Sequence, residues 1–188
     1  MSDFDFLAGH VALDFVNTVA NRLDSAKTGD LLRTPTDLTA WFAAAGSGAV
    51  EGLTEPDLNR ARDLREHLHK LFLAFACGEP PAAASLAVVD RCWRAGGSAR
   101  RLVVEDGRVG LSWADSAGAL ERGLAPILSA AVELLMSDRV ASIRQCEGVG
   151  CGWLFLNRSR GNSPRRWCSM SDCGNRAKAG RHYARVRI

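Results

Sequence analysis

The sequence predicts a mainly α-helical protein of the α+β class, in which one β-hairpin interrupts a helical body and a small cysteine-containing module follows it. Three observations favour this class. Apolar residues recur at helical spacing over several segments. The pair Asp106-Gly107 separates two short apolar runs, which indicates a hairpin. Four of the six cysteines are grouped beyond residue 140, in a chain whose 188 residues are enough to bury a core.

Two short helices are expected first. Residues 11–19 mix helical spacing with almost continuous apolar character. Residues 34–37, with the sequence TPTD, combine an N-cap residue with an early proline. Apolar side chains then recur up to Trp41 and Phe42, and Gly46 ends this second helix.

Three longer helices complete the body. Residues 54–57, with the sequence TEPD, open a helix with one apolar stripe, which Gly78 ends. Residues 82–94 are rich in alanine and are expected to form a helix that ends at Gly96-Gly97. Residues 116–136 form a second long amphipathic pattern that leads directly into the cysteine region.

The only clear β signal of the body lies between these helices. Residues 101–104 and 109–113 flank Asp106-Gly107, a pair that favours a two-residue hairpin turn. We therefore expect a helical domain with one hairpin over residues 1–140 and a separate module over residues 141–188.

Charge divides the chain at nearly the same place. Residues 144–188 hold ten Lys and Arg but only two acidic residues, a net charge of +8, which leaves −5 for residues 1–143. A compact basic segment indicates a phosphate-bearing partner, whereas the acidic body would repel nucleic acid. The opening MSDFDFLAGH is acidic where a signal peptide is basic, and no run approaches the roughly 18 apolar residues of a membrane span. We expect a cytoplasmic protein without a membrane partner.

The cysteine spacing predicts a metal site. Two C-x4-C pairs are separated by sixteen residues. Four thiolates around one cation suit zinc, which prefers a closed tetrahedral sulfur shell at structural sites. Two disulfides or unrelated buried thiols are the alternatives, and a reducing compartment disfavours the first of these. Cys77 and Cys92 are interpreted as core residues, and the metal ligands would be Cys146, Cys151, Cys168 and Cys173.

The rest of the module is expected to be treble-clef-like, with a β-hairpin and a C-terminal helix. Residues 153–156 and 165–168 are the expected strands, and the basic segment 158–164 is the tip between them. One side of the helix from Gly174 onward, which carries Tyr183, is expected to pack. So few residues cannot bury enough area alone, so one structural zinc would replace the missing core.

These motifs resemble a known family. The run Trp167 to Met170, followed by Cys173-Gly174-Asn175-Arg176, resembles the signature of CGNR zinc-finger proteins. Residues 9–18 resemble the start of their N-terminal partner, the ABATE domain, which is regarded as a stress-responsive transcription regulator. Asn157 stands where we expect this family to carry Asp more often, so any role for a charged acid there stays open.

The resemblance implies a bacterial-type transcription regulator whose zinc module binds DNA, and the basic composition agrees. The N-terminal domain would sense a small-molecule or stress signal, or bind a protein partner. His10, Asp14 and Asn17 are candidates to line a ligand pocket, although a hydrogen-bonded structural role for His10 and Asp14 is an equal alternative. The candidates for phosphate contact are Arg158, Arg160, Arg165 and Arg166 in the hairpin and Arg176, Lys178, Arg181 and Arg185 in the helix.

Other functions stay open at this point. In the second hypothesis zinc holds a rigid surface whose basic face docks an acidic protein partner, and RNA is also open, because a basic groove does not distinguish DNA from RNA. An enzyme is not expected, because the sequence shows no nucleophile–base spacing, no phosphate loop and no open metal position. A regulator that reads a palindrome is usually a homodimer. The operator, the inducing signal and the oligomeric state are not encoded in a readable pattern.

Overall fold

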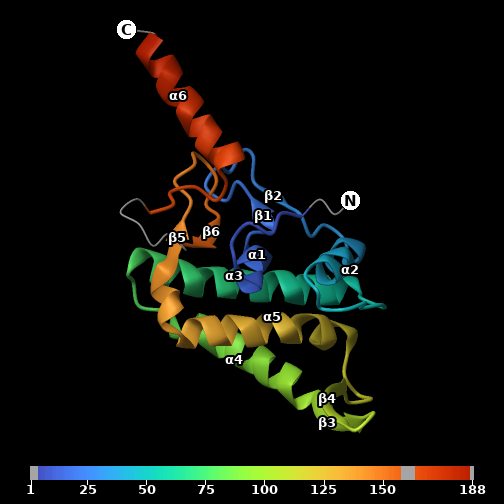
Figure 1. Cartoon of the computed structure of the whole chain (residues 1–188). Coiled ribbons are helices and arrows are strands. Elements are labelled where there is room, and N and C mark those ends of the chain that lie inside the picture. Colours follow the sequence, from blue (N-terminus) through green and yellow to red (C-terminus); the bar gives the residue numbers. More distant parts are fainter. Residues whose placement is uncertain (1–3, 158–163, 187–188) are drawn as a thin grey trace.

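Three long helices form the body. The computed structural model describes residues 4–157 and 164–186, with only the backbone described for residues 182 and 184–186. Helix α5 (Ala119–Met136) lies beside both α3 (Glu55–Cys77) and α4 (Ala83–Ser98), and the C-terminal module lies on the side of α3 away from α4 (Figure 1). The predicted class is confirmed: the protein is mainly helical with small hairpins.

The helix starts follow the local sequence signals. Helix α1 (Val11–Val16) begins after His10, whose Nδ1 accepts a hydrogen bond from the Ala12 N–H at 3.3 Å. Helix α2 (Pro35–Ala44) and α3 each begin with a Thr-Asp capping box that satisfies otherwise unpaired N–H groups. Gly78 ends α3 in the left-handed conformation, with φ of 73°. The predicted starts of α2 and α3 and the predicted end of α3 are confirmed, whereas α1 ends at Val16, before the expected residue 19.

Helix α4 extends beyond its expected end. It was expected to stop at Gly96-Gly97, yet it continues through both glycines to Ser98. The reason is packing against α5: a Cβ atom on Gly96 would lie 3.1 Å from the Cβ of Ala125. A missing side chain thus permits the close approach of two helices, and tertiary contact overrides the stop signal.

The predicted β-hairpin is confirmed. Strands β3 (Arg100–Glu105) and β4 (Arg108–Trp113) pair antiparallel, with Val104 opposite Val109. Asp106 and Gly107 have φ of 52° and 73°, as a type I′ turn requires. The hairpin lies at the end of the molecule opposite to the chain's C-terminal helix (Figure 1).

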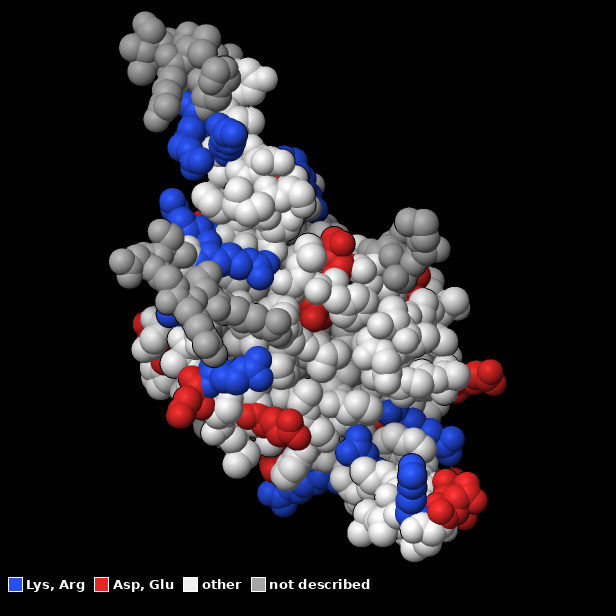
Figure 2. Space-filling model, viewed as in Figure 1, with Lys and Arg blue, Asp and Glu red and all other residues white. Residues whose placement is uncertain are grey.

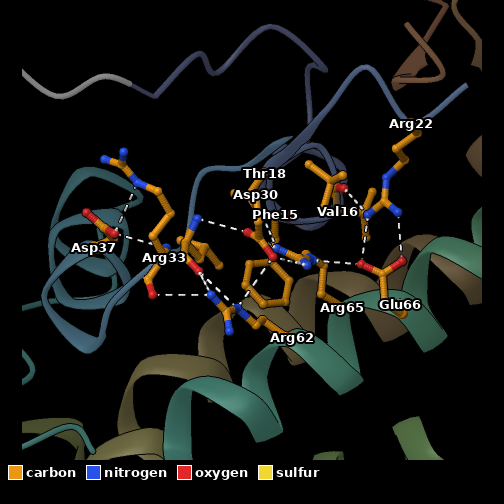
Figure 3. A network of polar contacts seen from close by, with 12 residues as sticks. Phe15, Val16, Thr18, Arg22, Asp30, Arg33, Asp37, Arg62, Arg65 and Glu66 are labelled. Carbon is orange, nitrogen blue, oxygen red and sulfur yellow. Dashed lines mark hydrogen bonds and ion pairs between the residues drawn. The ribbon is translucent and has the colours of Figure 1, made fainter. Parts of the chain in front are cut away.

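A second, unpredicted pairing joins β1 (Val19–Ala20) and β2 (Gly29–Asp30). A polar network attaches this segment to α3 (Figure 3). The guanidinium of Arg65, which is only 3% exposed, donates to both carboxylate oxygens of Asp30 at 2.7 Å. A buried arginine that is fully paired in this way fixes the position of the loop.

The strand pairing of the C-terminal module differs from the prediction. Strand β6 (Leu154–Leu156) pairs with β5 (Ile143–Gln145) and not with residues 165–168. Strand β5 follows directly from a 3₁₀ turn after α5, and its Ile143 is completely buried. The pairing is therefore decided by contact with the helical body, which local sequence does not reveal.

A π-helical turn (Met170–Gly174) leads into helix α6 (Asn175–Val186). Helix α6 projects away from the rest of the molecule (Figure 1). The expectation that one of its sides packs is wrong for the described side chains, since Ala179 is exposed and Tyr183 is 69% exposed.

One hydrophobic cluster extends across residue 140. It joins Phe15 and Leu68 of the helical body to Phe155 of β6 and to the four cysteines. Division of the chain into separate domains at this residue stays a prediction. Within the described part of the chain, every helix is too short or too polar to span a bilayer.

Candidate metal centre and nucleic-acid interface

The four paired cysteines meet in one buried cluster. Their sulfur atoms all lie within 4.8 Å of one another, and Cys168 lies 3.7 Å from Cys151 and 3.6 Å from Cys173. Sulfurs around a tetrahedral zinc with bonds of about 2.3 Å would be separated by roughly 3.8 Å. Disulfide sulfurs lie about 2 Å apart. The cluster therefore fits a zinc ion and not a pair of disulfides.

Hydrogen-bond donors surround the sulfurs as thiolates require. The backbone N–H groups of Gly148 and Cys168 donate to Cys146 Sγ at 3.4 and 3.2 Å. The Arg176 guanidinium donates to Cys173 Sγ at 3.0 Å. Such second contacts orient metal ligands and stabilise their negative charge.

Thiol protonation shows why the cluster needs a cation. The hydrogen bond from Cys151 lowers the pKa of Cys146 to about 2, whereas the hydrogen bond with Cys146 raises the pKa of Cys151 to about 12. The same neighbour also raises the pKa of Cys168. Four sulfurs this close cannot all ionise by themselves, and a divalent cation at their centre removes that conflict.

The loop between β5 and β6, residues 146–153, which we call the metal loop, must approach the sulfurs closely. A Cβ atom on Gly148 would lie 2.8 Å from Cys173 Sγ and 2.9 Å from its Cβ. Gly150, with φ of 76°, then turns the chain toward Cys151. Glycine is required at both positions, at the first for space and at the second for conformation.

Asn17 attaches the metal module to the helical body. Its amide Nδ2 donates to the Leu154 carbonyl at 2.8 Å, and its Oδ1 accepts from the Leu154 N–H at 2.9 Å. Asn17 is 3% exposed. Its side chain therefore pairs with the backbone of β6 as a neighbouring strand would.

A second attachment reaches the metal loop itself. The backbone N–H of Arg22 donates to the Cys151 carbonyl at 3.0 Å, and that of Leu23 to the Gly150 carbonyl at 3.1 Å. The guanidinium of Arg22 pairs with Glu66 of α3 at 2.7 Å (Figure 3). Arg22 thus connects α3 to a ligand-bearing loop, a role that no local sequence signal indicates.

The other N-terminal candidates also make structural contacts. Asp14 is buried, and its Oδ1 accepts a hydrogen bond from the Ala8 N–H at 2.8 Å. His10 caps α1, as described above. Ligand binding by His10, Asp14 or Asn17 stays a prediction.

Basic side chains gather beside the metal module. A groove of about 540 Å³ lies between the metal loop and α6, lined by four cations, one carboxylate and Trp167. Lys and Arg side chains also follow the surface of α6, whereas acidic and basic groups mix over the body (Figure 2). The cations of the groove are Lys27, Arg166, Arg176 and Arg181.

Seven of the eight expected phosphate contacts fall into three groups. Arg176, Lys178 and Arg181 are exposed on α6, and Arg181 lies over the Trp167 ring at 5.9 Å. Arg166 is paired with Glu147 at 2.5 Å. Outside the described atoms lie Arg158, Arg160 and the side chain of Arg185.

Arg165 supports the structure. Its Nε donates to the Trp167 carbonyl at 2.7 Å, another nitrogen contacts the Cys168 carbonyl, and the guanidinium lies 4.4 Å from the centre of the Phe155 ring. These contacts occupy most of its donors.

Lys27 was not expected at the basic surface but lines the groove. It comes from the helical body, and no sequence signal assigned it to this surface.

Asn157, the residue that follows β6, connects two other segments of the zinc module by hydrogen bonds. Its N–H donates to the Ser142 carbonyl at 2.9 Å, and its Oδ1 accepts from the Arg165 N–H at 3.3 Å. An amide oxygen accepts this bond as a carboxylate would. The contact needs an acceptor and does not require a charge.

A separate cavity of about 270 Å³ lies between α3, α4 and α5 and shares no lining residue with the basic groove. Its floor is apolar, with Leu64 and Leu128 almost completely buried. Arg60 and Glu121, which pair at 2.7 Å, stand at its rim. An apolar floor with a polar rim is typical of small-molecule sites.

Comparison with known proteins gives two family matches. Residues 9–138 match the family model ABATE, described as "putative stress-induced transcription regulator", and residues 142–186 match the CGNR zinc finger. No curated protein matches the chain. Together with the four-cysteine cluster, the second match identifies the metal centre as a structural zinc site.

Proposed function

Since this chain belongs to the ABATE family and ends in a CGNR zinc finger, we propose that it regulates transcription by binding DNA through its zinc module. The observation that carries this proposal is the basic groove between the metal loop and α6. In this proposal zinc is structural and not catalytic, because four protein ligands leave no coordination position for water or substrate.

Helix α6 has the form of a groove-reading element. Its twelve residues span about 18 Å, and a helix of this kind fits the major groove of B-DNA. A projecting helix of this length is marginal alone in water, so a partner that covers it supplies stability. Exposed Lys178 and Arg181 would contact phosphates, and base edges would be read from the same helix.

The salt dependence of binding tests this function. Fluorescence anisotropy with a labelled mixed-sequence duplex, measured over a range of salt concentrations, should give a steep decrease of affinity as salt rises. The double variant Lys178→Ala, Arg181→Ala should lower the slope by roughly 0.9 for each lost phosphate contact. The matched control Lys70→Ala, Arg139→Ala removes two cations from the helical body and should leave the slope unchanged.

Competition separates DNA from the other partners. Unlabelled duplex DNA should displace the labelled duplex, whereas an RNA duplex or an acidic peptide should compete only weakly. Stronger competition by RNA or by the peptide would replace the proposed partner. An unchanged salt slope in the α6 variant would remove α6 from the interface.

We further propose that the helical domain receives the regulatory signal in the cavity between α3, α4 and α5. The size and apolar floor of the cavity suit a small molecule with one polar group. Val88 lines the cavity and is half-buried, so Val88→Phe should fill it. A compound that raises the melting temperature of the native chain but not of this variant would support the cavity as its site; equal shifts would exclude it.

A further inference from the structure

Four large aliphatic side chains lie unprotected on one face of the β3–β4 hairpin. Their exposed fractions are 75% for Leu102, 74% for Val104, 73% for Val109 and 67% for Leu111. The register places Leu102 opposite Leu111 and Val104 opposite Val109, so the four form one continuous patch. We refer to these four residues as the hairpin face.

The helical body covers only the base of this hairpin. At the base, the Arg100 guanidinium lies 5.2 Å from the centre of the Trp113 ring, and the Ala114 N–H donates to the Ala99 carbonyl. The hairpin face extends beyond these contacts. A two-stranded hairpin with an apolar surface and two open edges is marginal in water unless another surface covers it.

Charges at the two ends of the hairpin are of opposite sign. The tip carries Glu105, Asp106 and Arg108, a net charge of −1. The base carries Arg100, Arg101 and Asp115, a net charge of +1. A second hairpin laid antiparallel on the first would place each tip over the opposite base.

We propose that the hairpin face binds the same face of a second copy of this chain, in an antiparallel, two-fold arrangement. Such contact removes eight aliphatic side chains from water and matches each negative tip with a positive base. A parallel arrangement would place like charges together and is disfavoured. The surface is self-complementary, as a two-fold interface requires.

The position of the hairpin leaves the zinc modules free. The hairpin and α6 lie at opposite ends of the molecule (Figure 1). A dimer joined through its hairpins therefore presents two separate basic surfaces. The inference does not depend on DNA binding and is tested without nucleic acid.

Sedimentation velocity over a range of protein concentrations tests this dimer. The zinc-loaded native chain should sediment as a dimer at micromolar concentration. Leu111→Glu should weaken association on the order of 100-fold, because it places two unpaired charges in an apolar contact. The control Met136→Glu changes an even more exposed apolar residue on α5, 84% exposed, and should remain dimeric.

A second pair of variants, which exchanges charges at the tip and the base, tests the dimer even if Leu111→Glu disturbs the hairpin. Glu105→Arg leaves the hairpin face intact, because residue 105 alternates to the other face of the strand, and it makes the tip positive, so it should weaken the dimer several-fold at low salt and not at high salt. Adding Arg101→Glu should restore association. A native chain that is monomeric at every concentration would overturn the inference and would indicate that another partner covers the hairpin face. Tighter association of Glu105→Arg would overturn the antiparallel arrangement.

Discussion

The amide of Asn17 and the backbone of Leu154 are paired by two hydrogen bonds, of 2.8 and 2.9 Å, although 137 residues separate them in the sequence. The contact is buried on both sides. It holds β6, and with it the zinc module, on the helical body. The position of the zinc module therefore depends on a residue just after α1.

Asn17→Ala should destabilise the protein by roughly 2–4 kcal/mol. The change leaves the N–H and the carbonyl of Leu154 buried without a partner, and each such group costs about 1–3 kcal/mol. Urea unfolding of the zinc-loaded protein measures the effect. The control Asn59→Ala alters an exposed position on α3 and should change the free energy of unfolding by less than about 0.5 kcal/mol. Equal effects of the two variants would contradict the proposed role of Asn17.

Purified protein should contain one zinc ion per chain, which elemental analysis measures. Cys168→Ser should lose the metal, because it removes one of four buried sulfur ligands. The zinc-free protein should melt roughly 5–10 °C lower, since metal binding contributes to folding. Cys77→Ser provides the matched control and should keep its zinc, because Cys77 is exposed and not in the core as the sequence had indicated. Native protein without zinc would contradict the assignment.

Gly148→Ala should weaken zinc binding by roughly tenfold or more. The added methyl group would stand 2.8 Å from Cys173 Sγ, so the metal loop or the sulfur must move. Competition with a chromophoric chelator measures the affinity. Gly97→Ala serves as control, because nothing lies within 4 Å of its added Cβ atom, and it should leave zinc affinity unchanged. If the two variants bind zinc equally well, the loop does not restrict the site.

Local chemistry explains which features the sequence predicted. The caps of α2 and α3, the Asp106-Gly107 turn and the cysteine pairs each depend on residues close together in the chain. The zinc site could be predicted because the type of ligand and the spacing of the cysteines are typical of structural zinc sites. These predictions are confirmed for that reason.

Long-range contacts explain what the sequence did not predict. The pairing of β5 with β6 requires Ile143 to be buried at the helical body, and the β1–β2 segment is fixed by Arg65 and Asp30, 35 residues apart. The same holds for Lys27, which reaches the basic groove because Arg22 attaches its loop to Cys151. No periodicity or motif marks such pairs.

Lys27→Ala should reduce the salt slope of DNA binding by about 0.9, the value for one phosphate contact. The reason is that Lys27 lines the basic groove although it belongs to the helical body. Anisotropy titrations at several salt concentrations measure the slope. Lys70→Ala removes an exposed lysine of α3 and should have no effect on it. An identical slope for both variants and the native chain would exclude the helical domain from the interface.

His69 should make stability depend on pH between about 6.5 and 4. Burial, and after it the nearby Arg22 charge, lower the pKa of its imidazole from 6.5 to about 4. Within the described structure, its Nε2 is buried without a hydrogen-bond partner. The folded state therefore holds His69 neutral, whereas the unfolded state takes up a proton as the pH falls below 6.5. Stability is complete above that pH and is lost as the pH falls toward 4.

Replacing His69 isolates this contribution. Between pH 6.5 and 5, the slope of the free energy of unfolding against pH should be smaller in His69→Leu than in the native chain, by up to about 1.4 kcal/mol per pH unit. Urea titrations of both proteins measure the slopes, and protonation of the cysteines affects both alike. Glu66→Gln is the control. Burial raises the pKa of Glu66, but the hydrogen bond from Arg22 outweighs it and lowers this pKa to about 2. Protonation of Glu66 therefore affects stability only below about pH 4.5, outside the range in which His69 is tested. Parallel slopes for the native chain and His69→Leu would show that this imidazole is not held neutral by the fold.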